Sequence, residues 1–240
     1  MDAIRIENLT KRYKDIVAVD NLNLCIHKGE LFSLLGVNGA GKTTTIKMLS
    51  CLVQPTSGNA FLNGKSICEN SAEVKSIISV SPQETAIAYG LSVCENLDLM
   101  CGVYGFTKEK RNKKIAELVK LLGLQSVSDK KAGKLSGGIQ RRLSIAMALI
   151  GEPEILFLDE PTLGLDVISR SDLWDLIRAL KGKITIVLTT HYMEEAEALS
   201  DRIAIMKDGK LLICNTADEI KKVAGVDNFE QAFIKIVKGV

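Results

Sequence analysis

A glycine-rich loop in the first fifth of the chain has the residue types and spacing that bind phosphate. Residues Gly36 to Thr43 match the pattern G-x-x-x-x-G-K-[ST] in full. The glycines let backbone N–H groups wrap the phosphates, Lys42 reaches the β- and γ-phosphates, and the Thr43 hydroxyl ligates Mg²⁺. An apolar run precedes the loop and a helical pattern follows it. The loop therefore predicts a phosphate-binding site rather than a bare glycine turn.

A second apolar run, Ile155–Leu158, ends in the adjacent carboxylates Asp159 and Glu160. Adjacent residues at a strand end point to opposite sides, so we expect the two acids to have different tasks. Asp159 would hold Mg²⁺ through its water shell, and Glu160 would face the γ-phosphate and polarise the attacking water. The alternative is a pair of surface acids that cap a turn.

Two further polar residues follow apolar, strand-like runs. His191 follows Ile184–Thr190, and Gln83 follows Ile77–Ser81. A lone histidine after a strand is more often structural, but open parallel sheets bind ligands beyond the carboxyl ends of their strands. We therefore expect all these groups at one sheet edge. There His191 could hydrogen-bond the γ-phosphate, and Gln83 could join the metal or the water to a mobile segment.

The stretch Leu135–Gln140 is a second candidate phosphate-binding element. The pair Gly137 and Gly138 follows Ser136, and an amphipathic helical pattern begins at once. A helix N-terminus with free N–H groups and little side-chain bulk favours an anion. Because the first site is already complete, this second element needs a separate explanation.

Hydrophobic periodicity predicts the elements that position these groups. Residues 1–30 alternate apolar and polar side chains, as antiparallel strands do. The middle third of the chain reads as helical, and strands and helices alternate after it. We expect buried parallel strands at Ile155–Leu158, Ile184–Thr190 and Ile203–Met206, a strand at Ser76–Ser81, and helices over Lys42–Leu52, from Ser92 to about Met100, over Thr107–Leu122, over about 137–150 and over about Asp227–Val237.

The set of motifs resembles the ATP-binding cassette (ABC) ATPases over essentially the whole chain. The family motifs match residues 36–44, Gln83, Leu135–Gln140, residues 155–160, Pro161–Asp166 and His191. Three positions depart from the usual pattern. The family's signature motif corresponds to Leu135–Gln140, and Ile139 stands where this motif usually has glutamine. Leu163 stands in place of a small polar residue, and Val167 in place of proline. The last two bear on the geometry of the dimer contact, and neither removes a catalytic group.

The resemblance implies an α/β fold with a P-loop NTPase (RecA-like) core. Its sheet is mainly parallel, with an N-terminal antiparallel β-subdomain and an inserted helical subdomain. We expect a single ABC ATPase domain over residues 1–240. The core and β-subdomain would occupy about 1–83 and 153–240, and the helical subdomain about 84–152.

The resemblance also implies ATP and Mg²⁺ as cofactors. Glu160, His191 and Gln83 would be catalytic, and Thr43, Gln83 and, through water, Asp159 would hold Mg²⁺. Tyr13 falls where the family stacks an aromatic ring on adenine; the alternative is a half-buried strand aromatic. The other nucleotide contacts implied are Asn38, Gly39, Ala40, Gly41, Lys42, Thr43 and Thr44.

In this family the signature motif serves a second copy of the cassette. Ser136, Gly137 and Gly138 would cap the γ-phosphate held by a partner, so that two identical chains pair head to tail around two ATP molecules. This pairing explains the second phosphate-binding element. The resemblance thus implies an ATPase that works only as a dimer.

Composition narrows the remaining choices. The net charge is +2, from 31 basic and 29 acidic residues, which gives no electrostatic footprint for nucleic acid. The six cysteines form no C-x-x-C pair, and only His27 and His191 could join them. We therefore expect no zinc site, and interpret the cysteines as small buried hydrophobes of a reducing compartment.

No segment has the roughly 18 consecutive apolar residues of a membrane-spanning helix. As a transporter the cassette would need separate membrane-spanning permease subunits, which we expect to dock at about residues 84–106. Resemblance to drug, antimicrobial-peptide and lipid exporters favours export, with the chain cytoplasmic and peripheral on the inner face of the membrane. The alternative is a soluble non-transport ABC ATPase that acts on a protein or nucleic-acid assembly.

Overall fold

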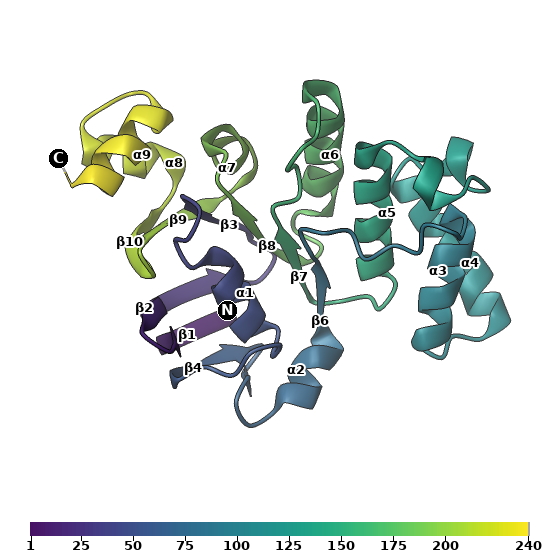
Figure 1. Cartoon of the computed structure of the whole chain (residues 1–240), viewed down its shortest axis with the longest axis horizontal. Coiled ribbons are helices and arrows are strands. Elements are labelled where there is room, and N and C mark those ends of the chain that lie inside the picture. Colours follow the sequence, from purple (N-terminus) through teal and green to yellow (C-terminus); the bar gives the residue numbers. More distant parts are fainter. Residues whose placement is uncertain (240) are drawn as a thin grey trace.

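The computed structural model describes residues 1–239 and contains two β-sheets (Figure 1). The smaller sheet is antiparallel, with strand order β2-β1-β4-β5. Its inward residues, such as Ile4, Leu24 and Ile26, are buried, as the alternation of apolar residues predicted. The strands are β1 (Asp2–Tyr13), β2 (Ile16–His27), β4 (Ser57–Leu62) and β5 (Lys65–Ser66).

The larger sheet has the order β10-β9-β3-β8-β7-β6. The neighbours from β9 to β6 are parallel, and only β10 is antiparallel to its neighbour. Consequently β3, β8, β7 and β6 are adjacent and end at the same edge. The strands are β3 (Leu31–Gly36), β6 (Ile78–Ser81), β7 (Ile155–Asp159), β8 (Thr185–Thr190), β9 (Arg202–Lys207) and β10 (Lys210–Asn215).

Some helices pack beside the sheets, and the others gather at the two ends of the molecule (Figure 1). Helices α3, α4 and α5 gather at one end, beyond β6 and α6, while α8 and α9 lie at the other end, near β9 and β10 (Figure 1). The helices are α1 (Lys42–Leu49), α2 (Ser71–Ile77), α3 (Val93–Val103), α4 (Lys108–Leu121), α5 (Gly137–Leu149), α6 (Val167–Leu180), α7 (Met193–Leu199), α8 (Ala217–Ala224) and α9 (Phe229–Lys238).

Helix α3 begins at the capping box expected from the sequence. The Ser92 hydroxyl accepts the Glu95 N–H at 3.2 Å, and the Glu95 carboxylate accepts the Ser92 N–H at 2.7 Å. Just inside the helix, the buried Asn96 side chain accepts the Ala88 N–H and donates to the Ala88 carbonyl. Asn96 thereby joins α3 to the segment that follows Gln83.

Some predicted boundaries differ from the structure. Ser76 and Ile77 end α2 rather than begin β6, because Val74 supplies a buried helical turn that the short apolar pattern did not reveal. Helix α1 ends at Leu49 and not at Leu52, because Cys51 takes a left-handed backbone conformation with a φ of 55°. The last helix starts slightly later than expected, since Asn228 caps it by accepting the Gln231 N–H.

Candidate functional site

The two carboxylates at the end of β7 are nearly buried and face different partners. Asp159 is 6% exposed, and its Oδ1 accepts hydrogen bonds from the hydroxyls of Thr43 at 3.2 Å and Thr189 at 2.5 Å. Glu160 is 7% exposed and lies 2.8 Å from Nδ1 of His191 and 3.5 Å from Nζ of Lys42. The expected separation of tasks therefore has a structural counterpart.

The backbone of Glu160 is in the left-handed region, with a φ of 47°. This conformation costs a non-glycine residue about 1–2 kcal/mol. It is held by the Glu160 N–H, which donates to both the carbonyl and the hydroxyl of Thr189 on the neighbouring strand β8. The strain turns the Glu160 side chain toward Lys42 and His191, at the edge where the strands end.

The glycine loop closes tightly around the Lys42 side chain. Nζ of Lys42 donates to the Gly36 carbonyl at 2.7 Å and the Val37 carbonyl at 3.3 Å. Gly41 has a φ of 101°, and a Cβ atom there would lie 2.5 Å from the Ala18 carbonyl. Only glycine fits this position, because both the backbone conformation and the approach of β2 exclude a side chain.

A cavity of about 490 Å³ opens over the loop, a volume within the range of small-ligand sites. Tyr13 at its rim is 43% exposed, and Nζ of Lys11 lies 5.0 Å from the ring centroid. The role of this ring in stacking on adenine stays a prediction. Of the predicted residues, the cavity wall contains Tyr13, Asn38, Gly39, Ala40, Gly41, Lys42, Thr43, Thr44, Gln83 and Glu160.

The signature residues lie outside this cavity, and Gly138 is buried. Among the described residues, the wall of this cavity contains none of Ser136, Gly137 and Gly138. Gly137 lines a second cavity of about 500 Å³, which shares only Gln83 and Glu160 with the first. Ser136 is the N-cap of α5, yet its hydroxyl makes no capping hydrogen bond. The glycine loop and Glu160 therefore share the first cavity, whereas Gly137 meets Glu160 only in the second.

Arg141 is a central residue that the sequence analysis missed. It lies on α5, is 4% exposed, and donates to the carbonyls of Asp159 at 2.6 Å, Pro161 at 2.8 Å and Gln83 at 3.3 Å, and to that of Pro82. Burial lowers the pKa of its guanidinium to about 10, although nearby carboxylates oppose the shift. The available signal was an arginine four residues before the buried Ile145, on the apolar stripe of the helix.

Glu195 is a second buried charge site that the sequence did not single out. It lies on α7, is fully buried, and accepts a hydrogen bond from Nε1 of Trp174 at 3.2 Å. Burial raises the pKa of its carboxyl, and the hydrogen bond from Trp174 opposes this. Glu195 therefore joins α6 and α7 behind the strand end that carries His191.

The parallel sheet, the glycine loop after β3 and the acidic end of β7 define a P-loop nucleotide-binding protein, as predicted. The profile of the family described as ABC transporter matches residues 19–163, which is more than half of the chain. The chain belongs to this family, and the resemblance drawn from its motifs is confirmed. The role of each site residue remains a prediction.

Curated relatives match nearly the whole chain. It is 40% identical over 226 residues to the human phospholipid-transporting ATPase ABCA3, 38% identical over 240 residues to the Escherichia coli probable multidrug ABC transporter ATP-binding protein YbhF, and 40% identical over 224 residues to the Streptomyces peucetius daunorubicin/doxorubicin resistance ATP-binding protein DrrA. These alignments cover 92%, 98% and 93% of the chain, but only 13%, 41% and 68% of the relatives' lengths.

Solved structures share the fold. A dimeric ATP-binding cassette in a post-hydrolysis state, bound to ADP and Pi, has a TM-score of 0.79 and 30% identity, covering 89% of this chain and 98% of that one. The structure of cbiO1 from Clostridium perfringens, described as part of the ABC transporter complex cbiONQ, has a TM-score of 0.84 and 26% identity, covering 92% of this chain and 94% of that one. The predicted α/β class is thereby confirmed. None of the helices in residues 1–239 has the length and apolar character needed to cross a membrane.

We predict that Arg141→Met lowers the free energy of unfolding by about 3 kcal/mol or more, because buried carbonyls on two loops lose their donor. Urea denaturation measures the change. The matched control is Arg142→Met, the next residue, whose ion pair with Asp172 lies at the surface and contributes about 1 kcal/mol or less. Equal losses in the two variants would contradict a special role for Arg141.

Proposed function

We propose that this chain binds and hydrolyses ATP, and that it does so as one half of a cassette dimer that drives transport by membrane-spanning subunits. The observation that carries the proposal is the convergence of Lys42, Thr43, Asp159, Glu160 and His191 at one sheet edge, beside a cavity with an exposed aromatic ring. A structural cluster of charges would need neither the glycine loop closed around Lys42 nor the cavity.

In the proposed reaction Glu160 accepts a proton from the attacking water, and His191 holds the Glu160 carboxylate through their 2.8 Å contact. Lys42 pairs with Glu160 and donates to a loop carbonyl. Phosphate oxygens would draw Lys42 away and leave Glu160 to act as a base. Gln83 lies on the walls of both cavities. Its position would therefore depend on whether nucleotide is bound.

Thr43 and Asp159 supply the oxygen atoms that suit Mg²⁺. Their side chains lie 3.2 Å apart beneath the glycine loop, and hydroxyl and carboxylate oxygens are preferred ligands of this ion. We propose that Thr43 and Gln83 bind Mg²⁺ directly and that Asp159 acts through water. The bound ion would supply neutralisation of the charge on the β- and γ-phosphates.

The proposed partner in hydrolysis is a second copy of this chain. The uncommitted Ser136 hydroxyl and the position of Gly137 outside the nucleotide cavity support a signature that serves the neighbour's γ-phosphate. Val167 and Ile168, which follow the loop that ends at Asp166, are 71% and 75% exposed. Apolar residues exposed to this degree suit a surface that a partner covers.

A groove whose wall includes Pro82 and Ala86, on either side of Gln83 in the sequence, is the proposed docking site for the permease. It measures about 360 Å³, is largely apolar, and contains Leu52, Met100, Tyr104 and Met147. Its proposed occupant is a cytoplasmic helix of a membrane-spanning subunit, because relatives are named as transporter proteins and the described helices cannot span a membrane. The chain would then be cytoplasmic, held at the inner face of the membrane.

Export is the proposed direction of transport. The E. coli relative is named as a multidrug transporter protein, the Streptomyces relative as a drug-resistance protein, and the human relative as phospholipid-transporting. We therefore propose an amphipathic drug-like or lipid cargo. A soluble ABC ATPase that acts on a protein or nucleic-acid assembly is the competing function. The partner that binds the docking groove, a membrane-spanning subunit or a soluble factor, distinguishes the two functions.

We predict that Glu160→Gln slows ATP hydrolysis by ~10²–10⁴-fold, because the amide cannot accept the proton. Steady-state phosphate release measures the rate, and nucleotide binding should persist. Glu154→Gln, at the other end of the same strand and hydrogen-bonded to Asn63, is the control and should keep the normal rate. A near-normal rate for Glu160→Gln would remove Glu160 from the catalytic role.

We predict that Leu52→Glu abolishes co-purification of the cassette with a protein that has several membrane-spanning segments, identified by mass spectrometry. The charge would have to be buried in the apolar groove. ATP hydrolysis by the isolated cassette should not change. Val223→Glu, equally exposed on α8, should leave the complex intact. A stable complex of the unmodified chain with soluble factors alone would support the competing function instead.

A further inference from the structure

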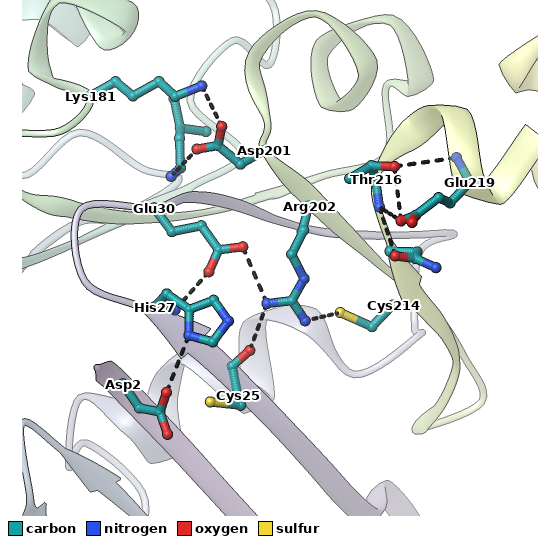
Figure 2. A network of polar contacts seen from close by, with 12 residues as sticks. Asp2, Cys25, His27, Glu30, Lys181, Asp201, Arg202, Cys214, Thr216 and Glu219 are labelled. Carbon is teal, nitrogen blue, oxygen red and sulfur yellow. Dashed lines mark hydrogen bonds and ion pairs between the residues drawn. The ribbon is translucent and has the colours of Figure 1, made fainter.

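Three potential metal ligands meet where β1 begins and β2 ends. They are Asp2, Cys25 and His27, and one ligand atom from each lies within 4.8 Å of the other two. Nδ1 of His27 is 3.2 Å from Oδ1 of Asp2. Figure 2 shows these side chains turned toward one another. The sequence contains no C-x-x-C pair and so predicts no zinc site. The strand spacing of Cys25 and His27 nevertheless brings a thiol and an imidazole together with a carboxylate.

Strand geometry places the three side chains on one face. Cys25 and His27 are two residues apart on β2, so they point the same way, while Leu24 and Ile26 between and beside them are buried. On β1 the register shifts between Asp2 and Ile4, so that Asp2 rather than Ala3 lies opposite His27. Such a shift re-aims a side chain, and here it brings a carboxylate to the thiol and the imidazole.

Hydrogen bonds to Glu30 and Arg202 hold the backbone of Cys25 and His27. The His27 N–H donates to Oε2 of Glu30 at 2.7 Å, and the Cys25 carbonyl accepts from Arg202 at 3.1 Å. Arg202 also pairs with Glu30, which is nearly buried, and donates to Sγ of Cys214 (Figure 2). These bonds hold two of the three ligand-bearing residues in place, and such preorganisation is typical of built metal sites.

We propose that Asp2, Cys25 and His27 form a site for Zn²⁺, with a fourth position open to water. Thiolate, imidazole and carboxylate together are the donor set of Zn²⁺, whereas Mg²⁺ and Ca²⁺ prefer oxygen alone. In a tetrahedral zinc site neighbouring ligand atoms are about 3.3–3.7 Å apart, given metal–ligand distances of about 2.0–2.3 Å. The His27 and Asp2 atoms are already 3.2 Å apart, and the three ligand atoms lie within 4.8 Å of one another.

The site is separate from the nucleotide cavity. Glu30, which accepts the His27 N–H, immediately precedes β3, whereas the glycine loop begins at the other end of β3. The two sites therefore lie at opposite ends of that strand. Bound Zn²⁺ would fasten the start of β1 to the end of β2. Its binding should therefore need no nucleotide and should stabilise the fold by mass action.

The test is a titration of nucleotide-free protein with Co²⁺, which reports thiolate ligation by a near-ultraviolet charge-transfer band, followed by displacement with Zn²⁺. We expect one equivalent to bind, with the band lost in Cys25→Ser, and with Asp2→Asn and His27→Gln each weakening binding by about tenfold or more. Cys68→Ser, at an exposed cysteine outside the cluster, is the matched control and should behave like the unmodified protein.

Thermal melting with and without Zn²⁺ supplies a second readout. The melting temperature of the unmodified protein and of Cys68→Ser should rise with Zn²⁺ and fall back with a chelator, while that of Cys25→Ser should not respond. Melting in chelator also checks that each variant is folded, and the three ligand variants alter different side chains. Absence of the band in the unmodified protein, or its persistence in Cys25→Ser, would overturn the proposal.

Discussion

The structure depends on two nearly buried carboxylates at the end of a strand that has no solvent along its length. Asp159 and Glu160 cannot stay ionised there without partners, because removing a charge from water is costly. The partners come from two other strand ends of the same sheet. Thr189 and His191 lie on and after the adjacent strand β8, and Thr43 and Lys42 follow β3, the next strand beyond it. The strand order that satisfies these charges also assembles the site.

Much of this arrangement follows from local sequence patterns. A parallel sheet places the residues after its strands at one edge, so the glycine loop, Gln83, the acidic pair and His191 were predictable together once each apolar run was recognised. The start of β6 could not be predicted in this way, because Ser76–Ser81 is too short for periodicity to distinguish the end of a helix from a strand. Register is equally invisible locally, and the shift that brings Asp2 to His27 has no signature in the sequence.

Arg141 shows why the rest of the site required the fold. Its carbonyl partners lie 18 to 59 residues away along the chain, and no spacing rule connects them. In the structure its guanidinium binds the helix that starts at the signature to the end of β7 and to the Gln83 segment. A change at Glu160 or Gln83 therefore has a rigid route to the signature surface, where the proposed partner sits.

The central claim is that one complete site needs two chains, and mixing two inactive variants tests it most directly. Lys42→Ala removes the phosphate contact of one chain, and Ser136→Arg blocks the signature of the other, so neither should hydrolyse ATP alone. In a mixed head-to-tail dimer one site keeps both intact halves, and an equimolar mixture should recover up to about a quarter of the normal rate if chains pair at random. A mixture as inactive as its components, with mixed dimers present, would contradict the shared site.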